Sequence, residues 1–213
     1  MQFALIVPAL ALAFLGVVSA FDTARAVRQA TATAVTLSDL STRIFDINDA
    51  GRDSLFMTGD ALMSRWPASP ATHSFSITSI INPVEADPSD PEVTEAVIWS
   101  ETDVPGNELE TSDLAAYNLP PIAEGESLIL VEVKGVYAPK FAGMGLPTNI
   151  PVRRTSVRRP RFVSEVTYYD SAGNPITYEA PSSGGGGGGA GLFLPVSTSR
   201  AGPIWRYASS SSG

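Results

Sequence analysis

Cysteine is absent from this 213-residue chain, and histidine occurs only once, as His73. The lack of cysteine excludes disulfide bridges, thiolate catalysis and cysteine-based zinc sites. No residue spacing supplies a second member of a catalytic triad for His73, so we interpret it as a surface residue. We therefore expect no metal or other cofactor, and we predict that the protein is not an enzyme.

Two further features fall short of catalytic or nucleotide-binding motifs. The glycine run Gly184–Gly189 lacks the Lys-Ser/Thr pair and the helix that follow a phosphate-binding loop. Glu132 alternates with valines in an apolar stretch and has no partner carboxylate. We interpret Glu132 as a buried structural carboxylate that faces Lys134 or the arginine cluster described next.

Basic residues are missing between Glu85 and Glu126, where the chain has twelve acidic residues. The formal net charge of −8 argues against nucleic acid as a partner. A calcium site near Asp87, Asp90 and Glu92 is weakly supported, because no known spacing or central glycine is present. A compact cluster is purely basic and comprises Arg153, Arg154, Arg158, Arg159 and Arg161. The charged segments are interpreted as solvated faces, as loops folded over one another, or as an interaction surface between subunits.

Charge is also absent from Phe3 to Phe21. A helix of this length approaches the ~30 Å hydrocarbon thickness of a bilayer, so residues 1–21 are predicted to be a transmembrane segment in contact with lipid. A cleavable secretion signal is the alternative, since small residues occur at Val18-Ser19-Ala20. The missing basic start and the long apolar run favour the anchor. A buried core helix is disfavoured, because the run is apolar all the way round.

Glycine and proline are absent from Phe21 to Ile47, which predicts that the helix continues as an amphipathic segment over residues 22–50. The positive-inside rule alone would place the domain in the cytoplasm, because Arg25 and Arg28 follow the span, but long domains translocate despite such charges. One apolar stripe recurs every three or four residues: Phe21, Ala24, Val27, Ala30, Ala34, Leu37, Leu40, Ile44 and Ile47. We expect this stripe to pack against a soluble domain.

Residues 51–180 are predicted to form an α+β domain. A helix is expected over Asp53–Arg65, closed by Trp66-Pro67. The expected strands are Ser74–Ile81, Val93–Trp99, a central Leu128–Tyr137, and Arg161–Tyr169. The loops between them lack crossover helices, so the prediction is an antiparallel sheet packed on the long helix, an α+β layer pair.

Two finer expectations concern strand faces and a turn. Val93, Val97 and Trp99 should share one face, as should Phe162, Val166 and Tyr168. The turn Asp170–Pro175 should reverse Val163–Tyr169 onto Ile176–Tyr178.

Residues 181–213 form a tail rich in glycine and serine. Its apolar segments Leu192–Pro195 and Pro203–Tyr207 are interpreted as docking back on the domain, binding a partner, or staying disordered.

Four sequence blocks follow one another in a specific order. They are Phe3-Ala4-Leu5-Ile6-Val7-Pro8, Trp99-Ser100, Leu128–Val133 followed by Tyr137-Ala138-Pro139, and Arg159-Pro160-Arg161. Together they resemble the TadE/TadG-like family of minor pseudopilins from tight-adherence (Flp) pilus systems. The resemblance covers roughly Gln2 to Arg161. Gln2 stands where the family has a glutamate, and no basic leader precedes it, so either the true start lies upstream or a prepilin peptidase does not process the chain.

The resemblance implies a protein with one helix in the bacterial inner membrane, a cytoplasmic N-terminus and a periplasmic domain. Its partners would be lipid, other pilus subunits and the assembly machinery, with no nucleic acid. The residues expected to pack against subunits and membrane are Phe3, Leu5, Pro8, Leu12, Phe14 and Phe21. The alternative function is a secreted or membrane-anchored surface-binding or adhesion module.

Overall fold

The computed structural model describes residues 3–64, 73–83, 95–139 and 149–177. The elements are α1 (Phe3–Ser41), β1 (Asp46–Asn48), α2 (Asp49–Met63), β2 (His73–Ile81), β3 (Ala96–Thr102), the 3-10 helix η2 (Thr111–Ala116), β4 (Ser127–Tyr137), β5 (Ile150–Arg158), β6 (Thr167–Tyr169) and β7 (Pro175–Ile176). The predicted tail and the candidate calcium residues Asp87, Asp90 and Glu92 lie outside the described residues.

Helix α1 is continuous over 39 residues, or roughly 58 Å at the usual rise. It ends at Ser41, so the predicted continuation over residues 22–50 is too long. Hydroxyl side chains near its end donate to backbone carbonyls three residues earlier: Ser38, Ser41 and Thr42. The Arg43 N–H donates to the Leu40 carbonyl at 3.1 Å, also three residues earlier, so the last turn tightens where the helix ends.

Helix α2 begins four residues before the predicted Asp53, at Asp49. The side chain of Asn48 caps it by accepting a hydrogen bond from the Gly51 N–H at 2.9 Å. The acidic Asp49 in the first turn also suits the positive end of the helix. The capping geometry therefore places the start of α2 earlier than the apolar pattern suggested.

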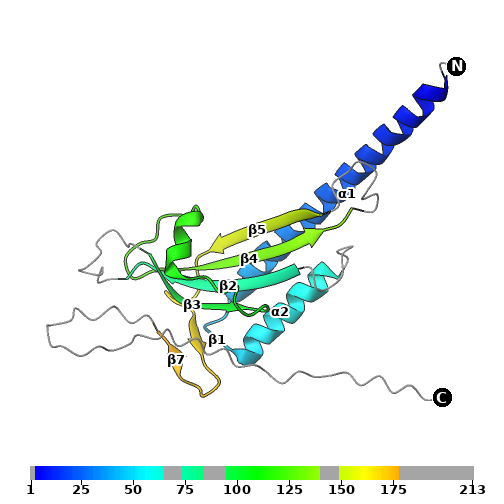
Figure 1. The fold of residues 1–213 in the computed structure, drawn as a ribbon. Coiled ribbons are helices and arrows are strands. Elements are labelled where there is room, and N and C mark those ends of the chain that lie inside the picture. The colour runs from blue at the N-terminus through cyan, green and yellow to red at the C-terminus, as the bar shows by residue number, and fades with distance from the viewer. Residues whose placement is uncertain (1–2, 65–72, 84–94, 140–148, 178–213) are drawn as a thin grey trace, which may run out of the picture. The chain divides into compact units, whose positions relative to one another are not determined.

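Four strands form an antiparallel sheet in the order β3-β2-β4-β5, with α1 packed along β4 and β5 (Figure 1). The predicted α+β class is confirmed, as is the central position of β4, whose Val131 is fully buried. Strand β5 was not predicted. It lies at the sheet edge and its arginine-rich sequence lacks a simple apolar alternation.

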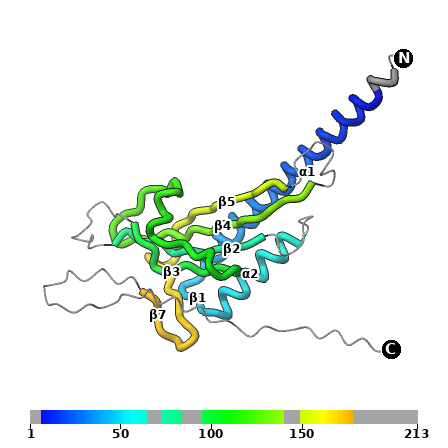
Figure 2. The backbone as a smooth tube through the Cα atoms, in the orientation of Figure 1, coloured from blue at the N-terminus to red at the C-terminus, as the bar shows by residue number. Residues whose placement is uncertain are grey.

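Side chains on both faces of this sheet are covered. On one face, α1 and α2 share a core with Phe75, Ile77 and Val131. On the other, the connection between β3 and β4 covers Leu128 and Leu130 (Figure 2, green). Polar residues that alternate with the apolar ones are therefore buried too: Ser76, Thr78 and Ser79.

Strand β3 contains a bulge that changes its faces. Ser79 opposes Trp99, whereas the next residue Ile80 opposes Val97, so Ile98 is the extra residue. Trp99 consequently packs in the core beneath the helices and Val97 against the opposite core. The prediction that Val97 and Trp99 share a face is wrong for this reason, and Val93 lies outside the described residues.

A second, small sheet has the order β1-β6-β7, with β1 and β6 parallel and β6 and β7 antiparallel. The predicted strand Arg161–Tyr169 is wrong in its first half, since only Thr167–Tyr169 is a strand. Phe162 is exposed and contacts Phe45, whereas Val166 and Tyr168 are buried.

The predicted turn after β6 is confirmed, although the paired segments are shorter than expected. The Asp170 carboxylate accepts hydrogen bonds from the N–H groups of Ala172 and Asn174, both at 2.8 Å. These bonds hold its pKa below the usual range. Gly173 adopts φ +81°, a conformation that suits glycine.

Candidate functional site: the exposed end of α1 and its sheet-packed half

The N-terminal half of α1 extends past the end of the sheet (Figure 1). Its large apolar side chains are uncovered, with Phe14 exposed to 69% and Phe21 to 71%. The others are Val7, Leu10, Leu12 and Val17. Covering six such side chains is worth on the order of 10 kcal/mol, so contact of this surface with water is unfavourable by about that amount.

Within the described part of the chain, α1 is the one helix long and apolar enough to cross a membrane. Length and composition alone also fit a signal sequence. Of the predicted packing residues, Leu12, Phe14 and Phe21 are exposed, and Pro8 lies within the helix. The side chains of Phe3 and Leu5 lie outside the described residues.

The second half of α1 packs on the sheet through mostly small side chains. The buried positions of this half are Ala26, Ala30, Thr33, Ala34, Leu37, Ser38 and Ser41, and Ser19 is buried just before it. Small residues let the helix lie close to the strands, and the Ser38 hydroxyl reaches the Ser156 hydroxyl on β5 at 2.7 Å. The predicted stripe is confirmed at Ala30, Ala34 and Leu37. It is wrong at Phe21 and Ala24, which are exposed because the packed face runs through Ser19 and Ala26 instead.

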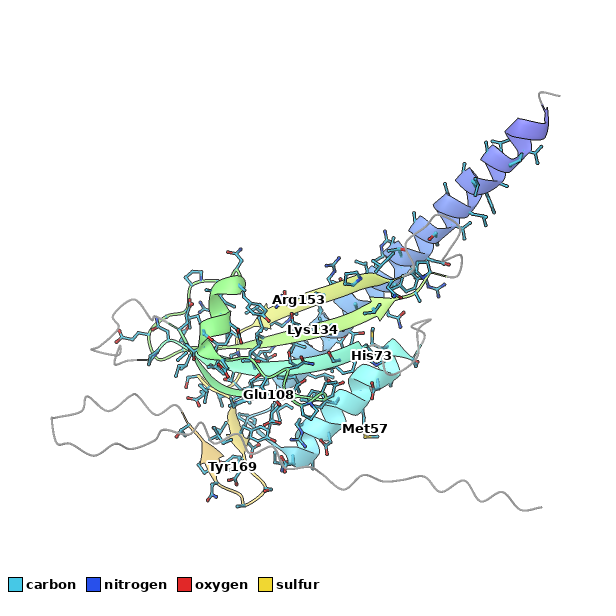
Figure 3. All side chains as sticks on the ribbon, viewed as in Figure 1. Met57, His73, Glu108, Lys134, Arg153 and Tyr169 are labelled. Carbon is cyan, nitrogen blue, oxygen red and sulfur yellow. The ribbon has the colours of Figure 1, made fainter. Side chains whose placement is uncertain are left out.

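A buried charged cluster lies on the sheet face opposite α1. The Glu132 side chain is 0% exposed, and its carboxylate accepts hydrogen bonds from Arg153 on β5 and from the Tyr117 hydroxyl after η2. The Lys134 ammonium lies 3.0 Å from the same carboxylate. Figure 3 shows Arg153 and Lys134 on neighbouring strands. The interpretation of Glu132 as a buried structural carboxylate facing these cations is confirmed.

Tyr117 joins this cluster to the connection between β3 and β4. Arg153 Nη2 donates to the Tyr117 hydroxyl at 2.6 Å, and the guanidinium lies 4.9 Å from the ring centroid. Burial, together with the nearby Glu132 charge, raises the pKa of Tyr117 to about 12. The hydrogen bond to Glu132 raises the pKa of Arg153. The four side chains thus tie β4, β5 and the connection together.

The five clustered arginines do not form one surface. Arg153 and Arg154 occupy opposite faces of β5, because successive strand residues alternate. Three of the arginines have acidic partners within the chain: Arg153 with Glu132, Arg159 with Glu126, and Arg161 with Asp39. Arg154 and Arg158 have no acidic partner among the described residues. Arg153, Arg159 and Arg161 nevertheless keep about half of their side-chain surface exposed, so the interaction surface stays a prediction.

A second ionic cluster was missed by sequence reasoning. Arg52 on α2 contacts Glu101 on β3 at 3.0 Å, Asp53 at 2.9 Å and the Tyr168 hydroxyl at 3.3 Å. Tyr168 in turn donates to Asp49 at 2.6 Å. Burial raises the pKa of both Glu101 and Tyr168. Local sequence does not indicate this cluster, since Glu101 and Tyr168 lie 49 and 116 positions from Arg52.

His73 is not the surface residue that was expected. Its side chain is 6% exposed, its Nε2 lies 2.9 Å from Asp60 Oδ1 on α2, and its ring packs edge-on against Phe75. Figure 3 shows His73 on β2 next to α2. The first residue of β2 is thus covered by α2, which the strand pattern alone does not reveal. In the described residues, no group of three histidine or acidic side chains is placed to hold a metal ion.

No family model, curated protein or solved structure matches the chain. The architecture itself is pilin-like. A long apolar N-terminal helix packs its second half on an antiparallel sheet, and its first half stays uncovered.

Proposed function

We propose that this protein is a membrane-anchored minor pseudopilin that takes part in assembling a tight-adherence (Flp, type IVb) pilus, without catalysis. The observation that carries the proposal is the division of α1 into an uncovered apolar end and a half packed on the sheet. Such a helix holds a folded domain at a membrane and offers a surface to neighbouring helices. The ordered sequence blocks that resemble the TadE/TadG-like family support the specific pilus system.

The proposed location is the bacterial inner membrane, with α1 as a single span and the domain in the periplasm. The absence of cysteine allows a direct test, because Ser112→Cys would place a single thiol at an exposed position. A membrane-impermeant maleimide should label it in spheroplasts with an intact inner membrane. Labelling that occurs only after lysis would contradict the periplasmic location.

Carbonate-washed membranes should retain the full-length chain, and a soluble form starting at Phe21 would establish a cleaved signal instead.

The pilus role is tested by deleting the gene and counting tight-adherence pili by electron microscopy. Deletion should abolish or sharply reduce the pili, and the wild-type gene should restore them. Phe14→Cys, at an exposed helix position, should form disulfide crosslinks with neighbouring subunits in oxidised membranes. Ala34→Cys is the matched control, because Ala34 is buried under the sheet and should not crosslink. Normal pili in the deletion strain would refute the proposal.

A further inference from the structure

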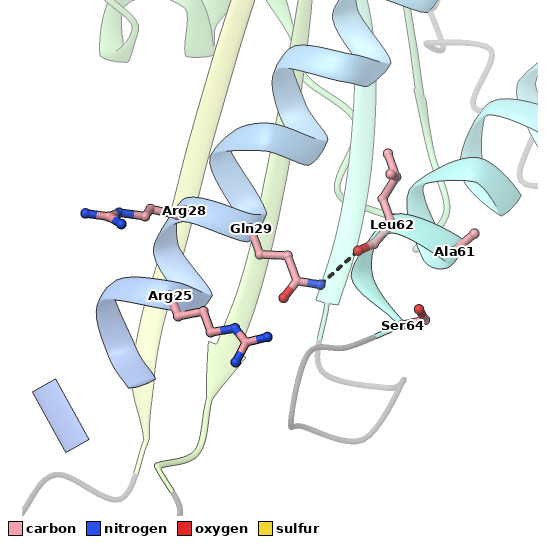
Figure 4. Close-up of a pocket in the computed structure, with 6 residues that line it drawn as sticks. All are labelled: Arg25, Arg28, Gln29, Ala61, Leu62 and Ser64. Atoms are coloured by element: carbon pink, nitrogen blue, oxygen red, sulfur yellow. Dashed lines mark hydrogen bonds between the residues drawn. The ribbon is translucent and has the colours of Figure 1, made fainter. Parts of the chain in front are cut away.

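A hollow of about 530 Å³ lies between α1 and the end of α2 (Figure 4). It is lined by Arg25, Arg28 and Gln29 from α1 and by Ala61, Leu62 and Ser64 from the end of α2. Gln29 Nε2 donates to the Leu62 carbonyl at 2.8 Å and joins the two helices across one side. The Arg25 guanidinium points toward the hollow, while that of Arg28 extends away from α2 in this view.

The two arginines carry positive charge that the chain itself does not use. Both are exposed, and neither has an acidic partner among the described residues. The nearest acidic residue on α1 is Asp22, and Asp60 on α2 is paired with His73. Exposed, unpaired guanidinium groups around a hollow favour an anion, and a planar guanidinium matches the oxygens of a phosphate.

Their position along α1 indicates where such an anion would lie. If the apolar span ends at Phe21, Arg25 follows about 6 Å further along the axis and Arg28 about 10 Å. The headgroup layer occupies several ångströms beyond the hydrocarbon on each side. Helical side chains also lean toward the N-terminus, here toward the bilayer, so both guanidinium groups reach the level of lipid phosphates.

We propose that Arg25 binds the phosphate of an anionic phospholipid headgroup at the surface of the membrane that α1 crosses, with Arg28, three residues further along α1, as a second cation near it. This inference rests on the proposed membrane anchoring and adds a ligand to it. Bound lipid would fix the height and rotation of the domain relative to the bilayer. Basic side chains next to a membrane helix are attracted electrostatically to anionic lipid headgroups.

A purely structural role for Arg25 is the competing explanation. Arg25 lines the same hollow as the last residues of α2, and positive charge near a helix C-terminus is stabilising. That role predicts a lower melting temperature for Arg25→Gln without lipid and an unchanged response to lipid. Lipid binding instead predicts that Arg25→Gln responds less to anionic lipid, with little change in the melting temperature measured without lipid.

The test uses the full chain in dodecyl maltoside micelles, with native mass spectrometry to count bound lipid and thermal unfolding to follow stabilisation. Phosphatidylglycerol should bind and raise the melting temperature, whereas phosphatidylcholine should bind much more weakly. Arg25→Gln should weaken phosphatidylglycerol binding about tenfold, and the double variant with Arg28→Gln further still. Arg43→Gln removes the same charge from the other end of α1 and should leave binding unchanged.

Equal phosphatidylglycerol binding by wild type and double variant would overturn the inference. Inorganic phosphate at millimolar concentration should not displace the lipid; displacement with similar stabilisation would show a site for soluble phosphate instead. The lipid-binding measurement in micelles and the carbonate test for membrane anchoring can fail independently of each other. A chain released by carbonate would refute the anchor, whereas a retained chain whose double variant still binds lipid would refute only this site.

Discussion

Glu132 and Arg153 form an ion pair across β4 and β5 in which the carboxylate is 0% exposed and the guanidinium side chain is 53% exposed. The pair is asymmetric, because the cation can return to water if its partner is removed, whereas the carboxylate cannot. Lys134, 39% exposed, is the carboxylate's other cation. Because of this asymmetry, substituting the cations and substituting the carboxylate should lower the stability by different amounts.

Removing the two cations should lower the free energy of unfolding more than removing the carboxylate does. The double variant Arg153→Gln, Lys134→Gln leaves a buried carboxylate without a cation and should lower the free energy of unfolding by about 3–5 kcal/mol. Glu132→Gln frees two cations that reach solvent and should cost about 1 kcal/mol. Urea unfolding of the purified chain in micelles measures both values. A larger loss of unfolding free energy for Glu132→Gln than for the double variant would contradict this expectation.

Substitutions of the two neighbouring arginines of β5, Arg153 and Arg154, should destabilise the domain to different extents. Arg153→Gln alone should cost about 2 kcal/mol, because it weakens the support of the buried Glu132. Arg154→Gln should stay within about 0.5 kcal/mol, since that side chain faces away from the cluster and has no acidic partner among the described residues. Melting temperatures of the two variants give the comparison. Equal losses would mean that the Glu132 cluster does not stabilise the domain.

Alkaline pH should destabilise the domain through Tyr117. Its pKa is raised to about 12 in the folded protein, while an unfolded tyrosine ionises near 10. Because the folded state holds the proton more tightly, the stabilisation is complete below pH 10 and is lost as the pH rises toward 12. Tyr117→Phe should show a smaller loss of stability than wild type between pH 10 and 12. Parallel pH profiles for both proteins would show that Tyr117 does not contribute.

The centre of β4 should not tolerate charge. Val131→Asp places a carboxylate without a cation in a fully buried position and should cost several kcal/mol, comparable with the whole ~5–15 kcal/mol stability of a domain. Val136→Asp, on the same strand but 39% exposed, is the matched control and should remain folded. Circular dichroism melting separates the two. Cooperative melting of Val131→Asp at the wild-type temperature would contradict the central role of the strand.

The close contact between α1 and the sheet should depend on small side chains. Ala34→Leu adds volume at a position with 0% exposure and should cost about 1–3 kcal/mol. Ala32→Leu makes the same change on the exposed side of the helix and should have little effect. Thermal unfolding of the two variants tests this difference. A similar loss in both would mean that overpacking beneath α1 is not the cause.

Local patterns predicted the features that depend on neighbouring residues. The uncharged run before Phe21 predicted the long apolar helix. Alternation predicted β2, and a nearly continuous apolar run predicted β4, each to within one residue at either end. The turn after Asp170 followed from its own residue types. These signals suffice because helix formation, strand alternation and turn geometry depend on residues a few positions apart.

Only the tertiary structure decided what depends on contacts between distant residues. Strand β5 exists because β4 offers it hydrogen bonds, although its own sequence reads as a basic cluster. The same pairing places Arg153 beside Glu132 and puts Arg154 on the other face, while Arg52 reaches Glu101 across 49 positions. The sequence by itself determined that an apolar helix leads into an α+β domain. Which charges are buried, paired or free was decided by folding, because burial and ion pairing are set by neighbours in space and not along the chain.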